Sequence, residues 1–160
     1  MSAQARVIRA EISSEPIDEN VIAGEVVDDR AGAIVTFNGV VRNHDQGRGV
    51  TSIEYSSHPS APEILREILE EIGARDGVHA VSCVHRVGHV TVGENAMVAV
   101  VAASHRSQAF SAISDLVDEV KDRLPVWKKQ RFPDGSHEWT GIADIESSPS
   151  QISEDEADQK

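Results

Sequence analysis

The sequence predicts a single α+β domain built on an antiparallel or mixed sheet with two main helices. Segments typical of strands and helices follow one another without strict βαβ alternation, and several neighbouring strands are separated only by short turns. Two segments, 60–73 and 107–124, carry clear helical periodicity. No complete G-x-G-x-x-G motif or P-loop is present, so the pattern does not favour a nucleotide-binding doubly wound sheet.

The first third of the chain is predicted to hold three strands and one short helix. Residues 6–12 alternate apolar and polar side chains, as a strand does, and the apolar positions of 16–29 have helical spacing. Residues 32–41 are rich in β-branched side chains and predict a buried strand. The polar, glycine-containing segment 43–49 predicts a mobile loop. Residues 50–57 alternate again, and we expect them to pair with 32–41 as a long hairpin.

The middle of the chain is predicted to form a helix followed by two strands. Residues 60–73 place apolar side chains along one helical face, with Pro62 in the first turn. Ser60 and Glu63 have the spacing of a capping box. Residues 78–90 and 95–104 predict two strands joined by a turn at 92–94.

The last third is predicted to hold the second main helix, a final strand and a tail. Pro125 ends the helix at 107–124, and its predicted inward positions are Phe110, Ile113, Val117, Val120 and Leu124. Residues 137–143 predict the last strand. Beyond it the chain is polar and acidic, so we expect a folded domain over residues 1–145 and a disordered acidic tail over 146–160.

Composition and charge exclude several classes of protein. Hydrophobic residues make up 39% and charged residues 26%, which is typical of a globular chain. The net charge of −12 does not favour nucleic acid or an anionic membrane as a partner, because both select basic surfaces. The single cysteine excludes an intrachain disulfide, and neither a secretory signal nor a membrane-spanning apolar run is present. We expect a cytoplasmic protein.

Candidate anion-binding residues stand at the ends of predicted elements. The segment 121–131 carries a net charge of +4 within this acidic chain. His105 and Arg106 follow an apolar strand and begin a helix, a place where backbone N–H groups favour anions. Arg42 closes the strand at 32–41. Lys121 flanks the apolar stripe of its helix, where it either covers the core with its aliphatic stem or reaches into a cleft as a base or nucleophile.

Histidine and cysteine give weaker signals. His85 and His89 lie four residues apart in a predicted strand, about 13 Å along its axis, which is too far for one metal ion. We therefore predict no metal site. Cys83 lies among apolar neighbours and is predicted to be a buried structural thiol.

Four sequence runs resemble the large, catalytic subunit of molybdopterin synthase. They are GAIVTFNGVVRNH at 32–44, HRVG at 85–88, ASHRSQAF at 103–110 and KDRLPVWKK at 121–129, and the likeness extends over about residues 5–143. The resemblance implies an α/β-hammerhead fold and a homodimer within a heterotetramer. It also implies a small ubiquitin-like sulfur-carrier subunit, whose C-terminal Gly-Gly thiocarboxylate supplies sulfur.

The resemblance also implies an activity and its residues. Two sulfur atoms would convert cyclic pyranopterin monophosphate into molybdopterin, a sulfurtransferase reaction that needs no cofactor. Lys121 and Lys128 would be catalytic. The implied substrate-binding residues are Val40, Val41, Arg42, His105, Arg106, Lys121, Lys128, Lys129 and Gln130.

Two positions depart from the family pattern. Val40 stands where some relatives carry a lysine, and Gln130 replaces a common acidic residue. Two other classes of function stay open at this stage: a non-catalytic module that binds anions or pterins, and an adaptor that binds a ubiquitin-like protein.

Overall fold

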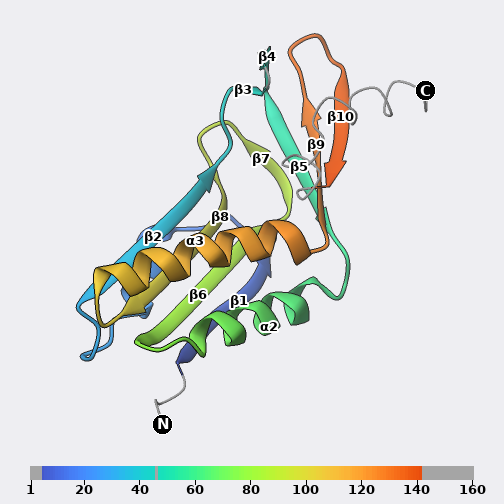
Figure 1. Cartoon of the computed structure of the whole chain (residues 1–160). Coiled ribbons are helices and arrows are strands. Elements are labelled where there is room, and N and C mark those ends of the chain that lie inside the picture. Colours follow the sequence, from blue (N-terminus) through green and yellow to red (C-terminus); the bar gives the residue numbers. More distant parts are fainter. Residues whose placement is uncertain (1–4, 46, 142–160) are drawn as a thin grey trace.

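The computed structural model describes residues 5–45 and 47–141, which form two four-stranded sheets and three helices (Figure 1). This confirms the predicted α+β class. The first sheet is mixed, because β1 runs parallel to β6 while all its other pairs are antiparallel. Its strands, in the order β1-β6-β8-β2, span Arg6–Ser13, Val78–Arg86, Asn95–Ala103 and Ala33–Val40.

The second sheet is antiparallel throughout. In the order β10-β9-β5-β7 its strands span His137–Gly141, Val126–Arg131, Ser52–Ser57 and Gly88–Thr91. A small hairpin of β3 (His44–Asp45) and β4 (Arg48–Gly49) lies within the segment predicted as a loop.

Helices cover both faces of the first sheet. The two main helices, α2 (Ala61–Gly73) and α3 (Arg106–Arg123), pack on one face, and the short α1 (Glu19–Glu25) packs on the other. The central strands β6 and β8 are therefore apolar along nearly their whole length. Among the described residues, no helix is long and apolar enough to cross a membrane.

Three strand predictions were wrong. Residues 50–57 do not pair with 32–41, because β5 belongs to the second sheet and lies between β7 and β9. The predicted strand at 78–90 is two strands, divided at Val87 and Gly88, where Gly88 has a φ of +91° and the chain passes into the other sheet. The segment after Pro125 was not predicted as a strand and forms β9.

Burial and capping also differ from expectation. β2 is an edge strand in which alternate residues are exposed, so it is not buried. Phe110 points outward and is 59% exposed, because the buried stripe of α3 runs through smaller residues: Ala109, Ala112, Ile113, Leu116 and Val120. Ser60 makes no capping hydrogen bond to α2, since its hydroxyl bonds to Nδ1 of His58 at 2.8 Å.

The remaining elements match their predictions. The first strand, the three helices and the strand beginning at His137 lie where the sequence places them. The end of that last strand, the boundary at residue 145 and the acidic tail lie outside the described residues.

Candidate functional site

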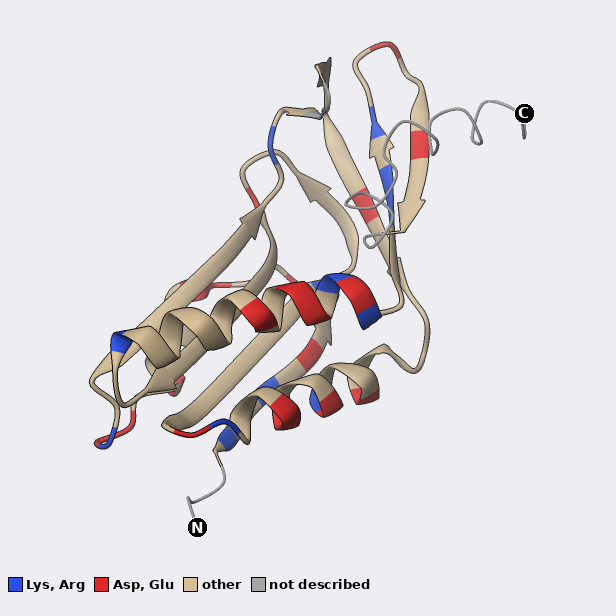
Figure 2. Cartoon of the chain, in the orientation of Figure 1, with Lys and Arg blue, Asp and Glu red and all other residues tan. Residues whose placement is uncertain are grey.

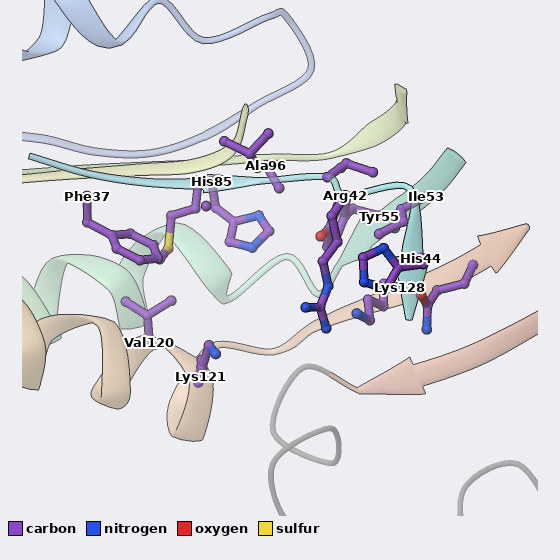
Figure 3. A pocket seen from close by; sticks show the side chains of 15 residues that line it. Phe37, Arg42, His44, Ile53, Tyr55, His85, Ala96, Val120, Lys121 and Lys128 are labelled. Atoms are coloured by element: carbon purple, nitrogen blue, oxygen red, sulfur yellow. The ribbon is translucent and has the colours of Figure 1, made fainter. Parts of the chain in front are cut away.

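A cavity of about 310 Å³ lies where the two sheets meet (Figure 3). The chain crosses between the sheets at this place, directly after β2, after β6 and after α3. The cavity is lined by Phe37, Gly39, Val40, Val41, Arg42, His44, Ile53, Tyr55, His85, Ala96, Met97, Val120, Lys121, Lys128 and Gln130.

Three predicted cations come together at this cavity. Arg42 follows the end of β2, Lys121 lies in the last turn of α3, and Lys128 lies on β9. Arg42 is exposed, whereas both lysines are half-buried. Figure 3 shows the side chains of Arg42 and Lys121 directed toward the same space. Segments far apart in the sequence thus concentrate positive charge around one cavity, which suits an anionic ligand.

The charge around the cavity differs from that of the nearby helices. Figure 2 shows Asp and Glu along α2 and α3, with Lys and Arg at both ends of α3, whereas Lys and Arg mark β9 and the segment after β2. Close to the cavity, Gln130 is almost fully buried on β9, two residues after Lys128 and therefore on the same face of the strand. Val40 and Gln130, the two positions at which the sequence departs from the family pattern, both line the cavity.

An apolar wall faces these cations. It includes the side chains of Phe37 on β2, Met97 on β8 and Val120 on α3. Val41 is buried and Val40 is 48% exposed. A cavity with both kinds of wall can hold a molecule that has an apolar or aromatic body and an anionic group.

His85 and Tyr55 line the cavity and were not predicted as site residues. His85, near the end of β6, is buried at 4% exposure, and its Nδ1 lies 2.8 Å from the carbonyl oxygen of Arg86. The ring of Tyr55 on β5 packs edge-on against it, with centroids 5.2 Å apart. Burial lowers the pKa of His85 to about 4 and raises the pKa of Tyr55 to about 12, so both are neutral at pH 7.

The sequence held one signal for His85, which is its place in the run HRVG. His85 and His89 were considered together as metal ligands, but they lie on strands of different sheets and His89 is exposed. Within the described ranges, no group of three His, Cys, Asp or Glu side chains could hold a metal ion. Cys83 is fully buried, as predicted.

Three predicted site residues do not line this cavity. His105 and Arg106 are exposed at the start of α3, fifteen positions before Lys121, which is about 22 Å along an α-helix. Backbone N–H of His105 donates to Oε1 of Gln108 at 3.1 Å. Lys129 points to the other face of β9, where its Nζ lies 5.2 Å from the ring centre of Trp139.

Fold and cavity together define an α+β protein with a cavity lined by cations where its two sheets meet. A family model described as MoaE protein matches residues 12–123. The molybdopterin synthase catalytic subunit of Dictyostelium discoideum is 34% identical over 145 residues, covering 88% of this chain and 91% of the relative. The Bacillus subtilis subunit of the same name is 34% identical over 134 residues, covering 83% and 85%. The chain therefore belongs to the MoaE family, and the predicted resemblance is confirmed.

Solved structures agree with this assignment. Molybdopterin synthase from Staphylococcus aureus superposes with a TM-score of 0.73 at 29% identity, covering 88% of this chain and 99% of that one. A complex of subunits 1 and 2 of molybdopterin-converting factor from Helicobacter pylori shares the fold, with a TM-score of 0.62 at 18% identity, covering 82% and 87%.

Proposed function

We propose that this chain is the catalytic subunit of a molybdopterin synthase, which transfers sulfur to cyclic pyranopterin monophosphate. The observation that carries the proposal is the convergence of Arg42, Lys121 and Lys128 on one cavity of the MoaE fold. The precursor carries a cyclic phosphate and the sulfur donor carries a thiocarboxylate, so the reaction brings two anions together. Three cations around one cavity offset the repulsion between those anions.

The catalytic roles follow from the position of each cation. Lys121 is half-buried at the end of α3, next to the apolar wall residue Val120. We assign it to the thiocarboxylate carbon, where an ammonium group stabilises the oxyanion of a tetrahedral intermediate or transfers a proton. Lys128 and Arg42 bind the phosphate and the pterin, because charge-assisted hydrogen bonds suit phosphate oxygens.

The partner is a small ubiquitin-like carrier with a C-terminal Gly-Gly thiocarboxylate. The relatives are named as catalytic subunits, a name that implies at least one further subunit. We propose a central homodimer in a heterotetramer, acting in the cytoplasm. We also propose residues 1–145 as the catalytic domain and 146–160 as a disordered acidic tail.

Lys121→Ala separates an enzyme from a binding module. Alanine keeps helix propensity high and no fully buried group is lost, so the free energy of unfolding should change by less than about 1 kcal/mol. Single-turnover sulfur transfer should slow by roughly two orders of magnitude or more, while the carrier still binds. Arg123→Ala is the matched control, since Arg123 lies on the same helix but pairs with Glu71 and lines no part of the cavity.

A parent-like transfer rate in a folded, carrier-binding Lys121→Ala protein would contradict the proposed role of Lys121. Absence of any dithiolene product from the unmodified chain, with its authentic thiocarboxylated carrier, would contradict the proposed enzyme. Precursor binding without sulfur transfer would then favour the non-catalytic module. Carrier binding alone would favour the adaptor.

His105 and Arg106 fit the proposed site only as contributions from a second copy of the chain. A helix of 18 residues separates them from the cavity of their own protomer, whereas a symmetric dimer can bring one protomer's helix start to its partner's cavity. Arg106→Ala should then weaken precursor binding by about 1.5–3 kcal/mol, the scale for a lost charge-assisted hydrogen bond.

Mixed dimers test this sharing directly. At a precursor concentration near the parental Kd, where Arg106→Ala is mostly unliganded, the Lys121→Ala and Arg106→Ala chains are unfolded and refolded together. The mixture should recover about a quarter of the parental rate, because half of the dimers then hold one intact site. No recovery in dimers shown to be mixed would mean that Arg106 does not act across the interface.

A further inference from the structure

His85 is a buried histidine in the lining of the cavity. The roles proposed for the three cations leave it without a function. It lies on the central strand β6, one residue before the strand ends and the chain turns toward the second sheet. The cavity is open to its ring, while Tyr55 holds the ring edge-on from the other sheet.

The hydrogen bond to Arg86 fixes which nitrogen of His85 carries the proton. A carbonyl oxygen only accepts, so Nδ1 must donate in the 2.8 Å contact to the Arg86 carbonyl. In the neutral ring, Nε2 then holds a lone pair and can only accept. Among the residues that the structure describes, Nε2 has no hydrogen-bond partner.

The surroundings keep this ring neutral. Burial lowers the pKa of His85 to about 4, and this effect outweighs the hydrogen bond to the Arg86 carbonyl, which acts in the opposite direction. Tyr55, which packs against the ring, is uncharged. A ring that holds a proton so weakly is a poor general acid or base at neutral pH, but it accepts a hydrogen bond well.

We propose that Nε2 of His85 accepts a hydrogen bond from an N–H group of the pterin ring system and so orients the precursor in the cavity. This inference rests on the proposed function. In this arrangement the phosphate would lie with the cations, and the ring system would lie against Phe37 and Met97, which line the cavity together with His85. Figure 3 shows Phe37 and His85 at the same cavity. Because the site otherwise offers cationic donors, a neutral acceptor there selects a ring that presents a donor. His85 is thus a positioning and specificity-determining residue.

The experiment compares variants that keep or remove the acceptor. His85→Met has a similar volume and replaces the ring nitrogen by a thioether sulfur, which is only a weak acceptor, whereas His85→Gln places an amide oxygen near the site of Nε2. His79→Met is the matched control, because His79 lies on the same strand, bonds to Ser104 at 2.7 Å and does not line the cavity. Isothermal titration gives the Kd of each protein for the precursor and for the carrier.

We expect His85→Met to raise the precursor Kd about tenfold or more, since the N–H of the bound ring loses its acceptor. His85→Gln should recover part of this loss, and His79→Met should bind as the parent does. The carrier Kd should not change, and KM for the precursor should rise by more than kcat falls. His85→Leu, which lacks an acceptor, gives the same measurement if His85→Met does not fold.

Parental precursor affinity in a folded His85→Met or His85→Leu protein would overturn the inference. A weaker carrier Kd with unchanged precursor Kd would also overturn it, because the donor would then belong to the carrier tail. Failure of the proposed function can be distinguished from failure of this inference. In the first case the unmodified chain would form no product with its carrier, while the precursor titration would still measure the contribution of His85 to binding. A parent chain that binds no precursor would overturn both.

Discussion

His85 should make the stability of this protein depend on pH from about 6.5 downward, which begins above the range in which the carboxylates are protonated. Its pKa is lowered from 6.5 to about 4 in the folded chain, because burial opposes the charged ring. Well above pH 6.5 the ring is neutral in both the folded and the unfolded chain, so it does not change the free energy of unfolding. As the pH falls from 6.5 to 4, the unfolded chain binds a proton that the folded chain does not, so the free energy of unfolding falls.

The size of this effect follows from the shift. At about 1.4 kcal/mol per pKa unit, the change from 6.5 to about 4 corresponds to a full loss of about 3.5 kcal/mol, of which about 3 kcal/mol has been lost by pH 4. Several carboxyl groups have pKa values lowered by arginine or backbone partners, among them Asp28, Glu71 and Glu94. The stability that these ionised carboxyl groups contribute is lost below about pH 4.5 as they are protonated. This loss is the same in all the variants compared.

The assay is urea unfolding followed by circular dichroism at several pH values from 7.5 to 4. The parent, His85→Met and the His79→Met control are compared at each pH. The difference in free energy of unfolding between the parent and His85→Met should change by about 3 kcal/mol across this range in favour of the variant, and the carboxylate contribution cancels in that difference. A difference that stays constant with pH would refute the argument that His85 is held neutral.

Two further predictions concern the core. Burial raises the pKa of the Cys83 thiol to about 12, so a thiol-specific reagent should react with the native chain far more slowly than with the chain in urea; equal rates would contradict its burial. Leu116→Ala removes a fully buried side chain of α3 and should lower the free energy of unfolding by about 2–5 kcal/mol in a urea titration, whereas a loss below 1 kcal/mol would mean that the helix repacks.

Features that depend on nearby residues could be predicted from the sequence. The helices α2 and α3 have their boundaries almost as expected, because apolar periodicity and Pro125 act within a few residues. The predicted inward face of α3 was wrong at Phe110, which is exposed, whereas Ala109 and Ala112 are buried against the sheet. Apolar periodicity favours the large side chain as the buried one and does not distinguish it from neighbouring alanines.

Features that depend on pairing across the chain could not be predicted. The sequence 50–57 alternates like any half-buried strand, and alternation does not say which strand lies beside it. Its neighbours are β7 and β9, and β9 itself contains adjacent lysines that obscure its period. Because β9 was not predicted, the second sheet was not predicted either. The cavity lies where the two sheets meet, so it could not be predicted from a single sheet.

The same distinction explains which site residues were found. Arg42 stands out in the sequence because it is a cation at the end of a predicted strand, and Lys121 because it flanks the apolar stripe of its helix. No comparable sequence feature distinguishes His85. It lies within an apolar strand, where a histidine is usually a buried core residue whose polar atoms are hydrogen-bonded. Its significance appears only because β6 ends at Arg86 and Gly88 carries the chain into the other sheet. The imidazole then packs against Tyr55 of that sheet and lines the cavity. The turn that divided the predicted strand is therefore also the feature that makes a core histidine available to a ligand.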